Sequence, residues 1–311
     1  MRLVFMGTPD FSVGTLEALL AAGHEIVGVV TQPDKPKGRG KTLLPTPVKE
    51  VALEHALPVY QPQKARDPQF IEQLRSLKPE AIIVVAFGQL LPKAILDMPP
   101  YGCINVHASL LPKYRGAAPI QWAVIDGEKE TGVTIMRMDE GLDTGDMIAK
   151  TVVTLEPDET GGSLFDKLSR EGASLCVKTL EEIEAGCAVY EKQPKESTTD
   201  YARMIDKKMG EIDWDQDAQK IEQLVRGLNP WPSAYTYMNG KILKIWKAQV
   251  LQETSQQQPG QVVKAEKDQL YIQTGKGILK IQELQLEGKK RMETGAFLRG
   301  HTVEVNTRLG R

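Results

Sequence analysis

The regular alternation of short apolar runs with amphipathic helical patterns over the first 150 residues most constrains the fold of this chain. Neighbouring parallel strands require a crossover connection, usually a helix, so the alternation predicts βαβ units and a mainly parallel sheet. The runs expected to form strands cover residues 3–6, 26–31, 81–86, 103–107 and 132–138. The helical patterns cover residues 11–22, 48–56, 68–77 and 117–125. Open α/β sheets bind ligands outside the carboxyl ends of their strands, and we expect the functional site there.

The pattern changes after a long amphipathic helix predicted at 163–185. A polar, proline-bearing stretch at 193–199 follows, and beyond it come strand-like runs joined by turns such as Asn239-Gly240. These runs cover residues 234–238, 241–251, 260–264, 269–274 and 278–286. The sequence therefore predicts an α/β domain with an open, Rossmann-like sheet at 1–190, a linker at 191–207 and a small antiparallel, OB-like β-barrel at 208–311.

Charge is distributed unevenly along the chain. The 39 lysines and arginines nearly balance the 41 aspartates and glutamates, and the net charge of −2 argues against a protein whose main task is to neutralise nucleic-acid phosphates. However, residues 218–311 hold 15 basic against 8 acidic side chains, or +7, and residues 1–217 hold 24 against 33, or −9. The basic C-terminal part is a candidate nucleic-acid platform, with a solvated lysine face as the alternative.

Cysteine content and hydropathy indicate the compartment. The three cysteines, Cys103, Cys176 and Cys187, are odd in number and far apart, so they form neither a disulfide framework nor a paired zinc signature. The N-terminal apolar run is too short for a signal-peptide core, and no run approaches the roughly 18 apolar residues of a membrane span. We expect a cytoplasmic protein without a metal and, since no apolar surface stripe requires a second subunit, a monomer.

A carboxamide and an imidazole end one of the predicted strands. Asn105 and His107 are two residues apart, so in a strand they project from the same face, while Ile104 and Val106 face the other way. Such a pair suits one task well, which is to hold the oxygen of a carbonyl as it becomes a tetrahedral oxyanion. We therefore interpret His107 as a functional histidine.

Two loops at strand ends extend this candidate site. The turn at 108–119 is long and rich in residues that fix the backbone, as pocket-forming loops are. The loop at 138–146 is acidic, and a carboxylate near His107 would stabilise its imidazolium form and could take a proton from an attacking amine. Spacing alone does not choose among Asp139, Asp143 and Asp146, each of which could instead be a solvated turn residue.

A basic insertion separates the second predicted strand from its helix. The connection runs to Pro47, whereas a βα connection usually has roughly 2 to 6 residues. Residues 33–41 carry four positive charges against one negative, and we expect their prolines and glycines to prevent ordinary secondary structure. We predict an arm that binds phosphates and is mobile until bound, against the alternative of a solvated loop. Its basic residues are Lys35, Lys37, Arg39 and Lys41.

In combination, these motifs resemble the methionyl-tRNA formyltransferase family, and the similarity runs from Phe5 to the C-terminal barrel. Several of the motifs occur throughout the wider folate-dependent formyltransferase group, whereas their combination is specific. The motifs are Gly7-Thr8-Pro9-Asp10-Phe11, the basic insertion, Asn105-x-His107, Ser109-Leu110-Leu111-Pro112, Arg115-Gly116-Ala117-Ala118-Pro119, Gly132-Val133-Thr134, Leu142-Asp143-Thr144-Gly145, Ile212-Asp213-Trp214 and Asn229-Pro230-Trp231-Pro232.

The resemblance implies transfer of a formyl group from the co-substrate 10-formyltetrahydrofolate to the α-amine of methionine on initiator tRNA, for translation initiation. It implies catalytic roles for Asn105, His107 and Asp143, and so selects Asp143 from the acidic loop. It further implies tRNA binding by the basic insertion and the C-terminal domain. The residues implied to contact folate are Ser109, Leu110, Leu111 and Pro112, and those implied to contact tRNA are Lys35, Lys37, Arg39 and Lys41.

Three other functions fit parts of the sequence. A formyltransferase for the amine of a nucleotide sugar or a purine precursor would share the triad, but a small substrate does not require the basic insertion. A non-catalytic RNA-binding protein would explain the basic regions but not Asn105, His107 and Asp143. A nicotinamide-dependent reductase would explain the α/β domain, yet the turn at Gly7 lacks the three glycines of a dinucleotide fingerprint.

Overall fold

The computed structural model describes residues 1–37, 42–253 and 255–310. Contacts divide the chain into two compact units, each built from segments that are separate in the sequence. The first unit contains Met1–Pro119, Glu130–Thr154 and Phe165–Ala202, and the second contains Ile120–Lys129, Leu155–Leu164 and Arg203–Arg311. Residues 120–129 and 155–164 therefore fold with the C-terminal part of the chain, a discontinuity for which the hydropathy pattern carries no signal.

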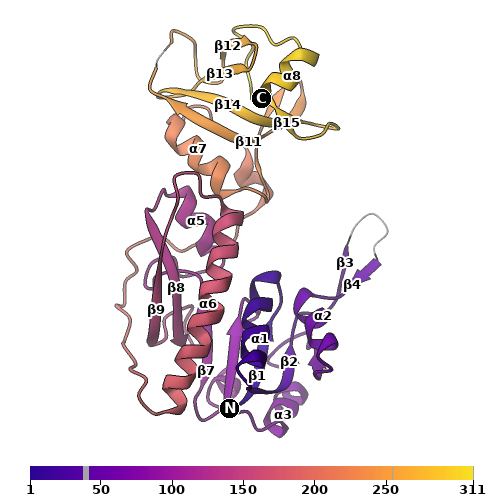
Figure 1. Ribbon diagram of the computed structural model, residues 1–311, viewed down its shortest axis with the longest axis vertical. Helices are drawn as coiled ribbons and strands as arrows, with labels where there is room; N and C mark the ends of the chain where they lie inside the picture. The colour runs from indigo at the N-terminus through magenta and orange to yellow at the C-terminus, as the bar shows by residue number, and fades with distance from the viewer. Residues whose placement is uncertain (38–41, 254, 311) are drawn as a thin grey trace. The chain divides into compact units, whose positions relative to one another are not determined.

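A seven-stranded sheet forms the centre of the first unit (Figure 1). Its order is β5-β2-β1-β6-β7-β8-β9. The first five strands in this order run parallel to one another, whereas β8 is antiparallel to both of its neighbours, β7 and β9. The strands are β1 (Arg2–Gly7), β2 (Glu25–Val30), β5 (Val59–Tyr60), β6 (Ala81–Val85), β7 (Cys103–His107), β8 (Glu130–Arg137) and β9 (Met147–Thr154). The predicted mainly parallel α/β sheet is confirmed. The pattern missed β5 and β9; β9 is an edge strand that alternates between partly buried and exposed residues and so lacks an apolar run.

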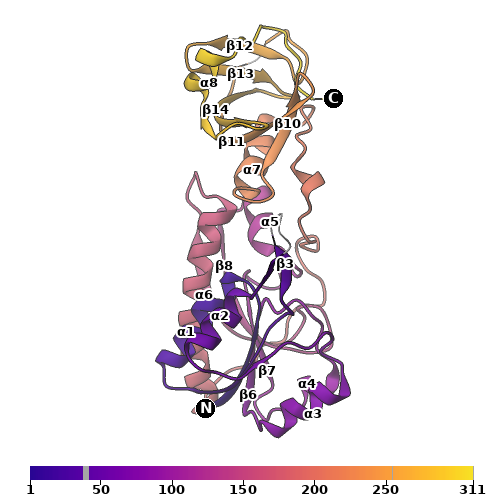
Figure 2. The ribbon, with the colours of Figure 1, turned by 90° about the vertical axis from the view of Figure 1, so that its right-hand side faces the viewer.

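Helices cover both faces of this sheet (Figure 2). On one side lie α1 (Asp10–Ala21), α2 (Pro47–Glu54) and most of α6 (Gly161–Glu184), and on the other lie α3 (Pro68–Ser76) and α4 (Lys93–Leu96). Because successive strand residues point to opposite faces, a strand covered on both sides must be apolar throughout, and β6 is buried at every residue. Within the described ranges, every helix is too short or too polar to cross a membrane.

The basic insertion contains two short strands, which corrects a prediction. β3 (Lys35–Lys37) pairs antiparallel with β4 (Thr42–Leu44), although Pro36 lies within β3. Each strand of a two-stranded ladder is an edge strand, and an edge strand tolerates a proline that cannot donate a hydrogen bond. The expectation that prolines and glycines exclude ordinary secondary structure here is therefore wrong for the two flanks, and residues 38–41 lie outside the described part.

The second unit is built on an antiparallel sheet with the order β10-β11-β14-β13-β12, to which β15 adds beside β14. This confirms the predicted small antiparallel domain after the α/β domain. The strands are β10 (Ala234–Met238), β11 (Lys241–Leu251), β12 (Val262–Glu266), β13 (Gln269–Gln273), β14 (Ile278–Leu286) and β15 (Met292–Glu293). The helices are α5 (Pro119–Ile125), the 3-10 helix η1 (Lys207–Gly210), α7 (Ala218–Gly227) and α8 (Thr294–Gly300).

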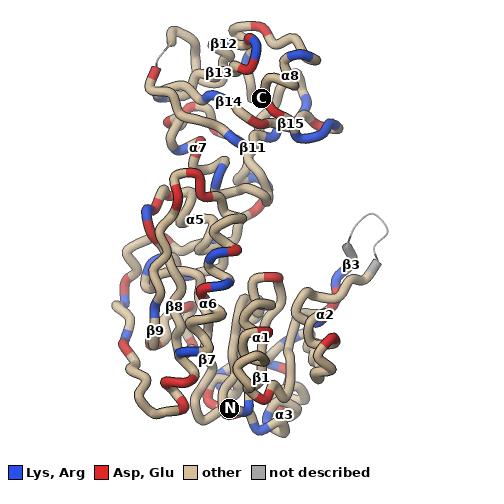
Figure 3. Tube along the Cα trace, in the orientation of Figure 1, with Lys and Arg blue, Asp and Glu red and all other residues tan. Residues whose placement is uncertain are grey.

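Basic residues of the second unit lie on several elements, among them β11 and the turn before β15 (Figure 3). Two of these residues contact the indole of Trp246. Lys244 Nζ lies 5.6 Å and the Arg291 guanidinium 4.7 Å from the centre of its ring. Such cation–π contacts hold positive charge over an aromatic face. Arg291 also forms an ion pair with Glu283, so part of the positive charge beside Trp246 is neutralised within the unit.

Candidate active site

Two polar side chains occupy the carboxyl end of β7. Asn105 and His107 are 8% and 6% exposed, in a strand that is buried throughout. Asn105 lies opposite Met136 of β8 and His107 opposite Thr134, so these four side chains share one face of the sheet. No described protein group bonds the Asn105 amide, and its polar atoms keep contact with solvent. Asn105 therefore has two N–H donors available for the oxygen of a ligand.

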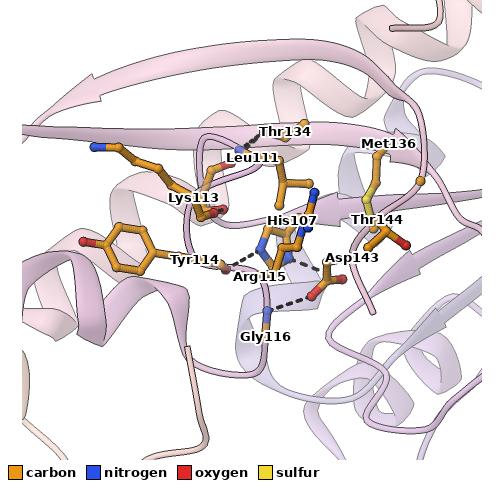
Figure 4. Close-up of polar contacts among 12 residues, drawn as sticks. His107, Leu111, Lys113, Tyr114, Arg115, Gly116, Thr134, Met136, Asp143 and Thr144 are labelled. Atoms are coloured by element: carbon orange, nitrogen blue, oxygen red, sulfur yellow. Dashed lines mark hydrogen bonds and ion pairs between the residues drawn. The ribbon is translucent and has the colours of Figure 1, made fainter. Parts of the chain in front are cut away.

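The ring orientation of His107 is set by a backbone carbonyl (Figure 4). Its Nε2 lies 3.0 Å from the Tyr114 carbonyl oxygen, and because a carbonyl can only accept, Nε2 carries a proton. Nδ1 is then the nitrogen free to gain or release a proton, and it faces Asp143 Oδ1 at 3.8 Å. This distance is too long for a hydrogen bond, so Asp143 acts on His107 through its charge, while Tyr114 orients the ring.

Asp143 is held by the neighbouring turn. Its Oδ2 accepts a hydrogen bond of 2.9 Å from the Gly116 N–H, which leaves Oδ1 toward His107. Its φ is +55°, a left-handed conformation that residues other than glycine rarely adopt and that gathers at functional sites. Asp139 has a different task, because its Oδ1 accepts from the Thr144 hydroxyl at 2.7 Å and so shapes the acidic loop. Of these two carboxylates, Asp143 is the one that faces the imidazole.

The turn after β7 is anchored by Thr134. The Thr134 hydroxyl accepts the Leu111 N–H at 3.1 Å and donates to the Ser109 carbonyl at 2.7 Å. The side chains of Ser109 and Leu111 are buried, whereas those of Leu110 and Pro112 are partly exposed. Leu110 and Pro112 are therefore the two of the four predicted folate contacts whose side chains offer surface to a ligand.

An apolar cluster lies beside the polar groups of the site. Leu111, Met136 and Met147 are buried together, and Met138 packs against them. Lys150 of β9 donates to the Leu111 carbonyl at 2.8 Å and so ties this cluster to the edge of the sheet. Apolar packing around a few oriented polar groups is the usual composition of a small-molecule site. The described residues hold no group of three or more His, Cys, Asp or Glu side chains that could bind a metal.

Two of the four predicted tRNA contacts, Lys35 and Lys37, belong to β3 of the β3–β4 hairpin. Lys35 is exposed at the start of β3, and Lys37 ends that strand. Arg39 and Lys41 lie outside the described residues. At the base of the hairpin, Lys49 of α2 donates to Asp34 at 2.6 Å, and this hydrogen bond lowers the pKa of the Asp34 carboxyl.

Sequence reasoning missed several groups of the site for a common reason. The Tyr114 carbonyl and the Gly116 N–H are backbone groups, which any residue type supplies. Only Gly116 had a signal in the sequence, which is that the residue is a glycine. Its φ is +128°, and an added Cβ would lie 2.6 Å from the Ala202 carbonyl oxygen, so the position requires glycine. Gln193, which contacts the Asp143 loop, lies in a stretch predicted as a linker.

Comparisons with known proteins bear on the family. Residues 1–180 match the family model described as Formyl transferase, and residues 204–302 match Formyl transferase, C-terminal domain. A methionyl-tRNA formyltransferase from Agathobacter rectalis is 64% identical over 304 residues, which cover 98% of each chain.

Two solved structures share the fold at low sequence identity. WlaRD, a sugar 3N-formyltransferase solved in the presence of dTDP and 5-N-formyl-THF, has a TM-score of 0.67 and 20% identity, over 93% of this chain and 99% of that one. HypX from Aquifex aeolicus in complex with tetrahydrofolic acid has a TM-score of 0.63 and 19% identity, over 99% of this chain and 50% of that one. Full-length identity is the stronger finding, and by it this chain belongs to the methionyl-tRNA formyltransferase family.

Proposed function

We propose that this chain transfers the formyl group of 10-formyltetrahydrofolate to the α-amine of methionine on initiator tRNA. The observation that carries the proposal is the contact between His107 and Asp143 beside the free amide of Asn105, in a chain 64% identical to a methionyl-tRNA formyltransferase. The donor set suits a formyl group, because an amide N–H and a protonated imidazole can both donate to one carbonyl oxygen.

The residues supply stabilisation of charge and movement of a proton. The folate co-substrate brings a formyl carbon that is already activated, so no metal is needed to polarise it. As the neutral amine attacks, Asn105 and protonated His107 stabilise the oxyanion that develops on the formyl oxygen. One carbon–nitrogen bond forms to the amine and one breaks to the folate, so the amine loses a proton and the folate nitrogen gains one. Asp143 stabilises the imidazolium and helps to move this proton.

The acceptor is proposed from the basic regions. The segment 35–41 contains Lys35, Lys37, Arg39 and Lys41 in its sequence, and in the second unit Lys244 and Arg291 lie near the Trp246 ring. Positive side chains suit a nucleic acid, because they contact its phosphates. A small amine acceptor would require neither feature.

Single-turnover formyl transfer to charged initiator tRNA tests the catalytic assignment. We expect His107→Ala and Asp143→Ala each to lower the rate by about 100-fold or more, the usual contribution of a positioned acid or base. His55→Ala, which removes an exposed histidine of the same unit, is the control and should keep the wild-type rate. A near wild-type rate in either His107→Ala or Asp143→Ala would contradict the catalytic role assigned to that residue.

Acceptor competition tests the substrate class. Labelled 10-formyltetrahydrofolate is mixed with methionyl-tRNA, an amino-sugar nucleotide and a purine-precursor amine in equal amounts. We expect label on the tRNA alone. Label on a small amine in place of the tRNA would replace this proposal by one of the other formyltransferase functions.

A further inference from the structure

The segment 193–202, part of the predicted linker, is bonded to both loops of the site within the first unit. Gln193 makes several of these bonds with a single side chain. We propose that Gln193 is a positioning residue, which holds the Asp143 loop against the Arg115–Gly116 turn and on which the rate of formyl transfer depends. This inference rests on the proposed function of His107 and Asp143.

Both halves of the Gln193 amide are used. Its Nε2 donates to the carbonyl oxygens of Asp143 at 2.9 Å and Gly145 at 2.8 Å. Its Oε1 accepts from the Arg115 guanidinium, at 3.1 Å from Nε and 2.9 Å from Nη2. One side chain thus connects the acidic loop to the turn that carries Gly116.

These bonds fix Asp143 from its backbone end. The Gly116 N–H already holds the Asp143 carboxylate, so this residue is gripped at both its carbonyl and its side chain. Asp143 has a left-handed φ of +55°, and such a conformation persists only when surrounding contacts over-determine it. Release of the carbonyl would let the loop relax and would change the 3.8 Å separation from His107.

The rest of the segment holds the other partner of His107. The Thr199 hydroxyl accepts the Tyr114 N–H at 2.7 Å, and the Ala202 N–H donates to the Arg115 carbonyl at 2.8 Å. Arg115 in turn donates to the Pro194 carbonyl at 2.7 Å. The segment therefore supports the turn that presents the Tyr114 carbonyl to the imidazole.

The chemistry of Gln193 selects glutamine. Two carbonyl oxygens require a donor and a guanidinium requires an acceptor, and a carboxamide supplies both. Glutamate has nearly the same shape but would present an oxygen to the carbonyls of Asp143 and Gly145. Alanine would remove both halves. Gln193→Glu thus removes the donor half while it keeps the acceptor for Arg115.

The test compares Gln193→Glu and Gln193→Ala with Gln73→Glu and Gln73→Ala, which make the same changes at an exposed position of α3. We expect both Gln193 variants to lower the single-turnover rate by about 10- to 100-fold, with KM for each substrate changed less than about 3-fold, since misplacement of a reacting group costs rate. The Gln73 variants should match wild type. A wild-type rate in both Gln193 variants would overturn the proposal.

A double-mutant cycle separates positioning from general destabilisation. If Gln193 acts through Asp143, Gln193→Glu should cause little further loss in the Asp143→Ala background. Fully additive losses would contradict the proposal, whatever the melting temperatures.

A second readout does not depend on the acceptor. The imidazole ¹⁵N shifts of His107 should change in Gln193→Glu and stay unchanged in Gln73→Glu. Unchanged shifts in both would refute the positioning role even if wild type formylated another amine. Wild type that formylates no methionyl-tRNA, with shifts that do change, would refute only the proposed function.

Discussion

The site at β7 and the β3–β4 hairpin belong to the same unit, yet they differ in burial and in how their side chains are held. His107 is buried, and its orientation depends on a backbone carbonyl. Lys35 is exposed, and the hairpin is tied at its base by Lys49 and Asp34. Reacting atoms must be placed closely, whereas charges attract phosphates over a screening distance of about 8 Å at physiological salt. Under the proposed function, chemistry would depend on groups held in fixed positions, and tRNA binding on charge.

The largest effect should come from loss of the Asn105 amide, to which no described protein group is hydrogen-bonded. We expect Asn105→Ala to lower the single-turnover rate by about 100- to 1,000-fold, as loss of one oxyanion donor does elsewhere. Asn105→Asp should be at least as slow, because a carboxylate would repel the developing negative charge. A wild-type rate in Asn105→Ala would show that formyl transfer does not depend on hydrogen bonds donated by Asn105.

A smaller effect, on stability, should follow from removal of the anchor beneath the turn. Thr134→Val leaves the Leu111 N–H without its acceptor and the Ser109 carbonyl without its donor in a buried position. A buried polar group without a hydrogen-bond partner destabilises a fold by about 1–3 kcal/mol. We expect the free energy of unfolding, measured in urea, to fall by this amount. Thr154→Val, at an exposed position of β9, is the control. Equal stabilities would mean that the turn does not depend on Thr134.

Removal of the hairpin charges should affect binding more than chemistry. We expect the combined change Lys35→Ala, Lys37→Ala, Arg39→Ala and Lys41→Ala to raise KM for the tRNA by about 10-fold while kcat stays near wild type. The dependence of log KM on log salt should become shallower by roughly 0.7 to 0.9 for each phosphate that the variant no longer neutralises. Lys64→Ala, an exposed lysine elsewhere in the unit, should change neither. A wild-type KM for the tRNA in the combined variant would contradict the assignment of tRNA binding to these residues.

The smallest effect at neutral pH should come from the thiols. Burial raises the pKa of Cys103 and Cys176 to about 12, while Cys187 is exposed. At pH 8 one thiol should react with a disulfide reagent, and activity should be unchanged. Because the folded pKa values are raised, the stability contribution is complete below the unfolded value of 9.0 and is lost as pH rises toward about 12. Unfolding measured between pH 8 and 11 should show this loss, and Cys103→Ala with Cys176→Ala should reduce it.

Much of the fold could be predicted because burial imposes periodicity. The strand at 103–107 and the runs at 234–238, 241–251 and 278–286 have the predicted bounds, since each is an apolar or alternating run between turn residues. β9 and α7 escaped prediction because β9 is half exposed and α7 is short and largely polar in sequence. Neither produces a continuous apolar signal.

The insertion shows the limit of residue-by-residue reasoning. Prolines and glycines disfavour regular structure as individuals, yet Pro36 lies opposite Leu43 in a ladder. A propensity describes an average environment, and the edge of a short hairpin is one in which the missing N–H of proline has no consequence.

By itself the sequence determined that Asn105 and His107 share a face, because strand geometry has a period of two, and its resemblance to a family selected Asp143. Only the tertiary structure decided which groups hold them. The Tyr114 carbonyl, the Gly116 N–H and the Gln193 amide come from a turn and from a segment about 80 residues later in the chain. Backbone groups carry no side-chain signature, and a polar residue in a proline-bearing stretch has the composition of a linker until folding brings it to its partners.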